Sequence, residues 1–256
     1  MSDPHHNLWA GAPMTPRLPS LDRSSVITVF DILRFAVGFV GLIAAAGTVA
    51  ALLLGAELAQ LQDLANADPI LALQVLGAFY LGLAIVVLAS VKWGRASVWT
   101  PLRLDVGAGK WLILGPLLAL AASAALDLGA VHLYEWVTGE KLDLEIDQFV
   151  RNATASPQIT AATVLVAGLI GPIVEELIFR GLFLGWLQRL MPFWLAALIS
   201  SALFGLAHVQ GAHAILAGLL GLVFAYLYRR AGSLWAPIAA HIANNVLAVV
   251  SVYAGL

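Results

Sequence analysis

Apolar residues along this chain gather into seven long runs that are separated by shorter polar stretches. A helix needs roughly 17–25 residues to cross the hydrocarbon core of a bilayer, which is about 30 Å thick. The runs of this length are 33–55, 70–91, 111–131, 160–187, 192–208, 212–229 and 233–254. The pattern predicts an all-α, polytopic membrane helical bundle of about seven transmembrane helices, or eight if a broken or interfacial helix is hidden.

The polar stretches divide the chain into four parts. Residues 1–30 are rich in proline and lack the short basic start of a signal peptide, so we expect a disordered cytoplasmic tail. Residues 31–131 hold the first three transmembrane helices. Residues 132–159 form an extracytoplasmic loop, and the spacing of its apolar residues between 142 and 150 suggests an interfacial helix. Residues 160–256 form a transmembrane core that carries the polar motifs.

Basic residues recur in alternate connections of the predicted bundle. They lie before or at the start of the first span, after the second and fourth spans, and at the end of the sixth: Arg17, Arg23, Arg34, Lys92, Arg95, Arg103, Lys110, Arg189, Arg229 and Arg230. Because connections rich in lysine and arginine stay in the cytoplasm, we expect the N-terminus inside and the C-terminus outside.

The composition agrees with a membrane protein, since 61% of the residues are hydrophobic and only 11% are charged. We therefore expect membrane lipids around the chain and no nucleic-acid partner, and the sequence carries no signal of an oligomeric state. The chain has no cysteine, which excludes a disulfide, a thiolate metal ligand and a cysteine nucleophile. The lack of cysteine and the short length favour a prokaryotic inner (plasma) membrane.

Three of the C-terminal runs carry polar residues, and an ionisable residue costs roughly 2.5–3.5 kcal/mol at the centre of a membrane helix. The candidate site residues are Glu175, Glu176 and Arg180 in one run, Phe204 and His208 in the next, and His241 and Asn245 in the last. The four-residue spacing of Glu176 and Arg180 predicts an ion pair that braces the site. Glu175 points about 100° away and has no partner in this scheme, which makes it the candidate for chemistry.

The two histidine motifs show the same helical spacing. His208 follows Phe204 by four residues, and Asn245 follows His241 by four. Each pair alone is more typical of packing or of hydrogen bonding between helices. Together with Glu175 they provide a base for water, a proton carrier and donors for an oxyanion, which is what peptide hydrolysis needs.

A metal site is an equally compatible interpretation of three of these residues. Glu175, His208 and His241 would supply the oxygen and nitrogen ligands of a catalytic Zn²⁺ and leave one position for water. The residue types do not decide between this scheme and a metal-free one.

Other residues near the motifs receive structural interpretations. His213 falls in a turn predicted around Gly211, so we expect a loop residue. Pro172 and Pro237 are expected to kink their helices and to free backbone carbonyls. Such kinks, or tilted helices, are needed because straight upright helices would place the motifs at different depths.

The motifs EExxxR, FxxxH and HxxxN, in this order on successive membrane segments, resemble the CPBP family of intramembrane proteases. This family includes the CAAX prenyl endopeptidases and the bacteriocin-processing (Abi) proteins. The resemblance covers about residues 160–254. It implies an all-helical core and an endopeptidase that cuts a membrane-tethered or lipid-modified, CAAX-like prenylated peptide inside a cavity.

The resemblance also implies roles for the motif residues. Glu175 with His208 would activate the attacking water, and His241 with Asn245 would stabilise the oxyanion. The remaining motif residues would brace the site. Since the family has been described both as metalloproteases and as glutamate-dependent enzymes, the resemblance also leaves zinc undecided.

Two functions of other classes fit the same residues. One is a proton-coupled transporter in which Glu175, His208 and His241 form a relay, although the hydropathy pattern shows no clear internal repeat. The other is a non-proteolytic membrane scaffold in which these side chains only hold helices together.

Overall fold

The computed structural model describes residues 26–49, 68–139, 156–208 and 211–255. Helices make up nearly all of the regular structure in these ranges, and no strand occurs in them. Five helices are α1 (Val29–Val49), α3 (Pro69–Lys92), α4 (Trp111–Thr138), α10 (Gly211–Ala231) and α11 (Trp235–Ala254). One long helix joins α6 (Pro157–Thr163), η4 (Val164–Ile170), α7 (Gly171–Glu176), η5 (Leu177–Leu184) and α8 (Gly185–Leu187), and a short helix, α9, covers Phe193–Leu206. The all-α prediction is confirmed.

Six helices of the described chain are long and apolar enough to cross a membrane. They correspond to six of the seven predicted spans. The fifth predicted span, 192–208, needs a correction because α9 has only 14 residues. At 1.5 Å per residue this helix is about 21 Å long, which is shorter than the hydrocarbon core. The protein is an integral membrane protein.

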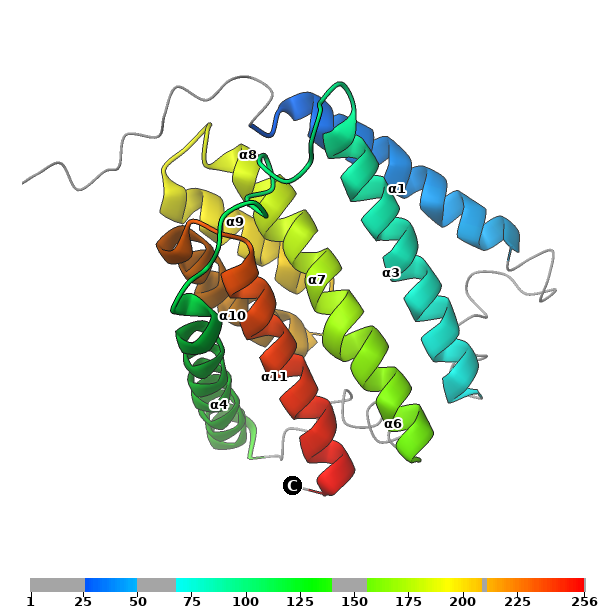
Figure 1. The fold of residues 1–256 in the computed structure, drawn as a ribbon. Coiled ribbons are helices and arrows are strands. Elements are labelled where there is room, and N and C mark those ends of the chain that lie inside the picture. The colour runs from blue at the N-terminus through cyan, green and yellow to red at the C-terminus, as the bar shows by residue number, and fades with distance from the viewer. Residues whose placement is uncertain (1–25, 50–67, 140–155, 209–210, 256) are drawn as a thin grey trace, which may run out of the picture.

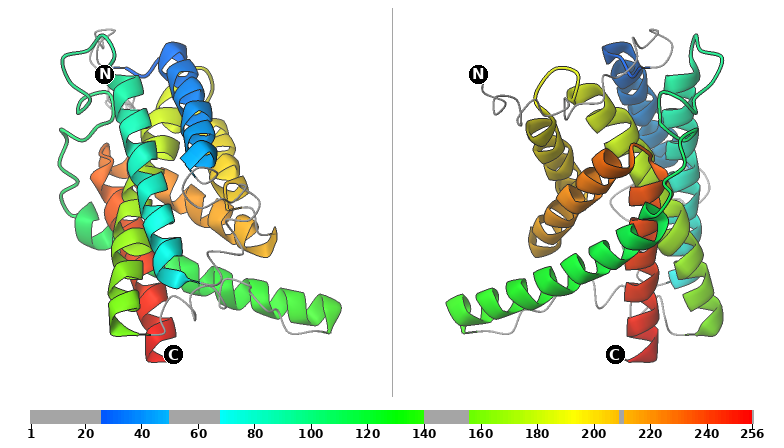
Figure 2. Two further views of the ribbon diagram at one scale, coloured as in Figure 1. Left: turned by 90° about the vertical axis from the view of Figure 1, so that its right-hand side faces the viewer. Right: turned by 60° about the vertical axis from the view of Figure 1, so that its left-hand side comes forward.

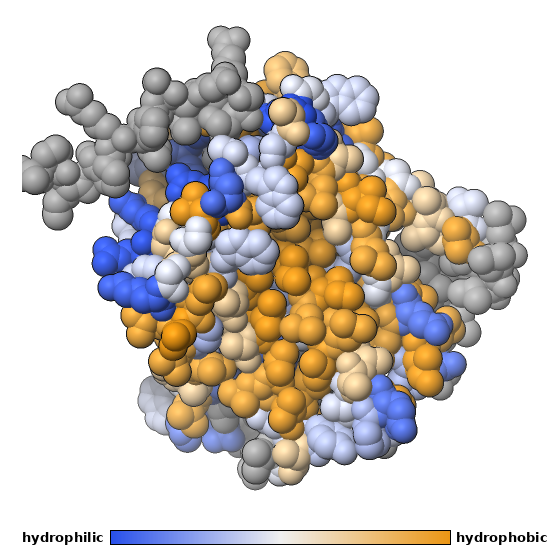
Figure 3. Space-filling view, in the orientation of Figure 1, coloured by the Kyte–Doolittle hydropathy of each residue, from blue (hydrophilic) through white to orange (hydrophobic). Residues whose placement is uncertain are grey.

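The surface of the bundle agrees with this environment. Large aliphatic side chains are widely exposed, such as Val37 on α1, Ile85 on α3 and Ile113 on α4. Figure 3 shows hydrophobic residues over most of the centre of one face, with hydrophilic residues gathered mainly towards its periphery. Exposed apolar surface of this extent is expected in contact with lipid, whereas in water it would promote aggregation.

Two predicted boundaries change in the structure. Helix α4 continues to Thr138, so the start of the predicted loop at 132–159 is helical. The end of that loop is helical too, because α6 begins at Pro157, where Ser156 accepts a hydrogen bond from the backbone N–H of Ile159. The predicted interfacial helix between 142 and 150 and most of the predicted N-terminal tail lie outside the described residues.

The helices pack in a defined arrangement (Figure 1). Helices α1, α3, the 157–187 helix and α11 follow one another across the front of the view, while α9 and α10 lie behind. Helix α4 packs on α10 and α11 and then leans away to one side (Figure 2). The 157–187 helix is the most buried of the six spans and contacts α3, α9 and α11, so it forms the centre of the bundle.

Pro172 changes the hydrogen bonding of this central helix. Proline has no N–H, so it cannot donate to the carbonyl four residues earlier, as an α-helix requires. The backbone before it follows the wider π-helical pattern over Val164–Ile170, and the N–H of Gly171 reaches back to the carbonyl of Val166. In this register the carbonyl of Ala167 would need the missing N–H of Pro172. It is therefore free to accept a hydrogen bond from another helix.

Glycines allow α9 and α10 to approach closely at the rear of the site. A Cβ added to Gly205 on α9 would overlap the carbonyl oxygen of Ala214 and lie 3.1 Å from the Cα of Gly218, both on α10. Neither backbone contact can rotate away as a flexible side chain would. The short helix α9 is therefore held against α10 by direct backbone contacts.

We expect the Gly205→Ala substitution to destabilise the protein by about 1–3 kcal/mol or more, because it forces two packed helices apart. Gly41→Ala is the matched control. Gly41 lies inside α1 with no neighbour within 4 Å of an added Cβ, so alanine there should be neutral or stabilising by up to about 1 kcal/mol. Thermal unfolding in detergent measures both. Equal melting temperatures for the two variants would contradict the close contact.

Candidate active site

A buried ion pair forms the innermost part of the site. The Arg180 Nη1 atom lies 2.9 Å from Glu176 Oε1, and both side chains are fully buried. The Nη2 atom of Arg180 donates to the carbonyl of Gly221 at 2.8 Å, which joins the central helix to α10. The guanidinium also lies over the rings of Phe204 and Phe224, 4.7 and 5.3 Å from their centroids. The charge is thus held by a carboxylate, a carbonyl and two aromatic faces.

His241 joins the same carboxylate from α11. Its Nδ1 atom lies 3.0 Å from Glu176 Oε1, and its ring stacks on Phe224 with centroids 4.6 Å apart. Because Glu176 Oε1 also accepts from Arg180, we assign Nδ1 of His241 as the donor of this contact. The other ring nitrogen, Nε2, is not engaged by Glu176. It lies 3.7 Å from Glu175 Oε2.

Glu175 has a partner that the sequence did not indicate. The hydroxyl of Tyr80 on α3 donates to Glu175 Oε1 at 2.5 Å. The carboxylate is 15% exposed, so it lies at the edge of the buried network and not inside it. The prediction of an unpartnered Glu175 is wrong in this respect, because the partner comes from a helix distant in sequence.

His208 lies two residues beyond the end of the short helix α9 and is oriented by the backbone of that helix. Its Nδ1 atom lies 2.8 Å from the carbonyl oxygen of Phe204. A carbonyl only accepts, so Nδ1 is the donor and the Nε2 atom of the neutral ring is a base. The Phe204 ring lies between the two motif histidines, with centroid distances of 4.7 Å to His208 and 5.6 Å to His241.

His213 is the second residue that sequence reasoning placed wrongly. It lies in the first turn of α10, not in a loop, and its ring centroid is 5.2 Å from that of His208. The turn predicted around Gly211 is instead the start of α10, so His213 lies within the helix. The signal that identifies it is the shared helical face that His213 forms with Leu216, Ala217 and Leu220, all on the cavity wall.

Asn245 is anchored to the central helix. Its Nδ2 atom donates to the carbonyl of Ala167 at 3.1 Å, the carbonyl that Pro172 leaves without a helical partner. This contact agrees with the expectation that Pro172 frees a backbone carbonyl near the polar residues. A carboxamide nitrogen has two hydrogens, so one remains available after this bond.

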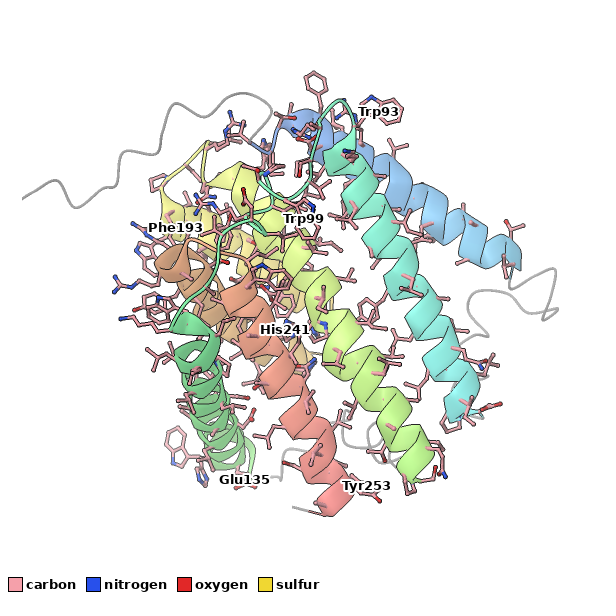
Figure 4. All side chains as sticks on the ribbon, viewed as in Figure 1. Trp93, Trp99, Glu135, Phe193, His241 and Tyr253 are labelled. Carbon is pink, nitrogen blue, oxygen red and sulfur yellow. The ribbon has the colours of Figure 1, made fainter. Side chains whose placement is uncertain are left out.

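A cavity of about 530 Å³ is lined by Phe204, His208, His241 and Asn245, whereas Glu175, Glu176 and Arg180 are not among its lining residues. Helices α4, α9, α10 and α11 and the π-helical turn η4 form its walls, and its polar lining consists of Ser123, Asp127, His208, His213, His241, Asn244, Asn245 and Ser251. His241 lies at about half the height of the bundle (Figure 4). The site is therefore a partly polar chamber well away from both ends of the helices.

The zinc site that Glu175, His208 and His241 would form stays a prediction. Among the residues that the structure describes, no group of three histidine, aspartate or glutamate side chains is gathered as metal ligands. Glu175 and His241 approach one another, and the Nδ1 atom of His208 bonds a backbone carbonyl, a contact that leaves its Nε2 atom available. The reaction proposed below uses side chains of this chain alone.

The chain was compared with known protein families. Residues 157–247 match the family described as type II CAAX prenyl endopeptidase Rce1-like. This segment contains all three motifs and excludes α1, α3 and α4. The resemblance predicted from the motifs is confirmed.

Two curated proteins are similar to the chain. The "Putative membrane peptidase YdiL" of Bacillus subtilis (strain 168) is 33% identical over 140 residues, which cover 55% of this chain and 54% of that protein. An "Uncharacterized 24.3 kDa protein" of Escherichia coli is 28% identical over 130 residues, covering 48% of this chain and 60% of that protein. The matches thus span little more than half the length of these relatives. No solved structure gives a significant match.

Proposed function

Because residues 157–247 belong to the Rce1-like group of the CPBP family, we propose that this chain is an intramembrane endopeptidase of the CAAX type. Its substrate would be a membrane-tethered or lipid-modified, CAAX-like prenylated peptide that enters the chamber from the bilayer. The observation that carries the proposal is the approach of Glu175 Oε2 to His241 Nε2, 3.7 Å apart in the middle of a membrane bundle. A carboxylate inside a membrane bundle is costly to insert, and such residues usually mark a functional site.

The reaction begins with water beside Glu175. The Oε2 atom takes one proton from this water while its oxygen attacks the carbonyl carbon of the scissile peptide bond. His208 contributes a second base through its Nε2 atom, because its Nδ1 atom is held as a donor by the carbonyl of Phe204. General bases placed in this way typically contribute 10²–10⁴-fold to a rate.

The attack produces a tetrahedral oxyanion, which needs hydrogen-bond donors. Asn245 offers the amide hydrogen that its bond to Ala167 leaves free. His241 donates from Nε2 only when the ring carries two protons, since Nδ1 already holds one. The Glu176 carboxylate, 3.0 Å from Nδ1, orients the ring, as the aspartate of a serine-protease triad orients its histidine. The intermediate collapses when the carbon–nitrogen bond breaks and the amine nitrogen receives the proton taken from water.

We also propose the membrane orientation that the basic connections predict, with a cytoplasmic N-terminus in a prokaryotic inner membrane. The connection between α3 and α4 supports it, because Arg95, Arg103 and Lys110 lie there together. In this orientation the N-terminal end of α11, with His241 in its second turn, lies nearer the cytoplasm than Ser251, which lines the cavity further along the same helix.

The test uses purified protein in lipid nanodiscs with a farnesylated CAAX-like peptide, and mass spectrometry of the products. We expect one cleavage site in the lipidated peptide and much slower cleavage of the same peptide with serine in place of the lipidated cysteine. The matched variant His208→Gln keeps a polar side chain but removes the base, so its kcat should fall about 10²–10⁴-fold.

The outcome that contradicts this function is an intact, folded protein that cleaves neither peptide. Flux driven by a pH gradient in proteoliposomes, without any cleavage, would then support the transporter. If the His208→Gln variant fully replaced the wild-type protein in cells that lack it, the result would support the scaffold function.

A further inference from the structure

Tyr80, which donates a hydrogen bond to Glu175, lies outside the segment that the family match covers. Tyr80 is on α3, and the matched segment begins at residue 157. The two residues are 95 positions apart in the chain, and their side chains meet at 2.5 Å. An O–H···O⁻ distance of 2.5–2.7 Å is typical of a hydrogen bond to an ionised acceptor. The contact is therefore a strong one, made by the half of the protein that the motifs do not reach.

The backbone opposite Tyr80 leaves room for its ring. Gly171 begins α7, and a Cβ added there would lie 3.0 Å from Tyr80 Cζ and 3.2 Å from its hydroxyl oxygen. Real Cβ atoms rarely come this close to another atom. The absence of a side chain at Gly171 thus lets the phenol pass the central helix and reach the carboxylate one turn further on.

The hydrogen bond distinguishes the two oxygens of Glu175. Tyr80 holds Oε1, whereas Oε2 is the atom that approaches His241 Nε2. A carboxylate without such a partner rotates broadly about its last torsion, which has no sharp minima. The donor on α3 fixes that rotation and leaves the second oxygen directed towards the histidine.

We propose that Tyr80 is a positioning residue of the active site. Its hydroxyl holds Glu175 Oε1 so that Oε2 takes the proton from the attacking water beside His241. The inference rests on the proposed function, since it gives Glu175 a reaction to perform. It makes α3 a part of the catalytic unit and not only a neighbouring membrane helix.

The Tyr80→Phe variant tests this role, because phenylalanine keeps the ring next to Gly171 and removes only the hydroxyl. We expect kcat for the lipidated peptide to fall about tenfold or more, with KM changed by less than about twofold, since the contact acts on the reacting group and not on substrate binding. Tyr226→Phe on α10 is the matched control. Tyr226 packs on Trp111 and should keep the wild-type kcat.

A second measurement does not depend on activity. In a double-mutant cycle, Tyr80→Phe should lower the melting temperature by about 2–4 °C in the wild-type background and not in the Glu175→Ala background, where the hydroxyl has already lost its acceptor. A structural role independent of Glu175 would give the same decrease in both.

The outcomes separate the two proposals. An active wild type with an unchanged kcat in Tyr80→Phe, a change in KM alone, or additive melting temperatures would overturn the role of Tyr80 and leave the peptidase intact. A wild type that cleaves no peptide would overturn the proposed function and with it the role of Tyr80 in the reaction. A lower kcat together with a non-additive cycle supports both.

Discussion

Replacing Arg180 with methionine is expected to cost about 3–5 kcal/mol of stability, because it leaves the buried Glu176 carboxylate without its counter-ion. Arg180 is fully buried and binds both Glu176 and the carbonyl of Gly221, so its loss strands two acceptors. Methionine has a similar length and fills the space between the two phenylalanine rings. The measured decrease would therefore report the lost charge and hydrogen bonds more than a cavity. Thermal or denaturant unfolding in detergent measures it.

Two further variants show where the cost arises. Arg230→Met removes an exposed arginine that lies at the end of α10, and such substitutions usually change stability by less than about 0.5–1 kcal/mol. The double variant Glu176→Gln/Arg180→Met removes both buried charges and should recover most of the lost stability. A double variant no better than Arg180→Met would mean that the ion pair is not the cause.

The helices of this protein could be predicted well from hydrophobicity, because a spanning helix must be long and apolar whatever its neighbours are. The exceptions have physical reasons. Helix α9 ends at Leu206, before the end of its apolar run, and beyond it the His208 side chain engages the carbonyl of Phe204 while its backbone N–H bonds the carbonyl of Gly205. The π-helical pattern before Pro172 does not change hydropathy, so only the missing N–H of the proline indicated that the backbone would differ there.

The site could be predicted only as far as local spacing reaches. The Glu176–Arg180 pair is present because residues four apart on a helix face one another. The third member of that network, His241, bonds Glu176 across helices, and no spacing in the sequence encodes this contact. Tyr80 was missed for the same reason, since a single tyrosine in an apolar helix resembles many others. The sequence predicts a loop for His213 because it lies next to Gly211, whereas Gly211 begins α10.

These contacts also change the interpretation of the second glutamate. The sequence predicts that Glu176 only braces the site, and its pair with Arg180 does so. The same oxygen accepts from His241 Nδ1, which fixes the tautomer of that ring and directs Nε2 towards Glu175. Bracing and chemistry are therefore linked through one carboxylate, as in triads where a buried acid orients a histidine.

Glu175→Gln is expected to lower kcat by about 10⁴-fold or more while leaving the fold intact. Glutamine has the shape of glutamate, and its carbonyl oxygen can still accept the hydrogen bond from Tyr80. It cannot take a proton from water, however, so both the base and the later proton donor to the amine are lost. Because the position is partly exposed and outside the Arg180 ion pair, the melting temperature should stay close to that of the wild type. Cleavage of the lipidated peptide in nanodiscs measures the rate.

Glu175→Asp provides the geometric counterpart of that substitution. It retains the charge but shortens the side chain by one methylene, which withdraws the carboxylate from Tyr80, from His241 or from both. A displacement near 1 Å commonly costs about 10²-fold in rate, so its kcat should lie between those of the wild type and Glu175→Gln. If Glu175→Asp and Glu175→Gln were equally inactive, the presence of a carboxylate would not be sufficient for catalysis, and its position would be decisive. If glutamine retained wild-type activity, Glu175 would not be the group that activates water, and the hydrolytic mechanism would have to begin at His208.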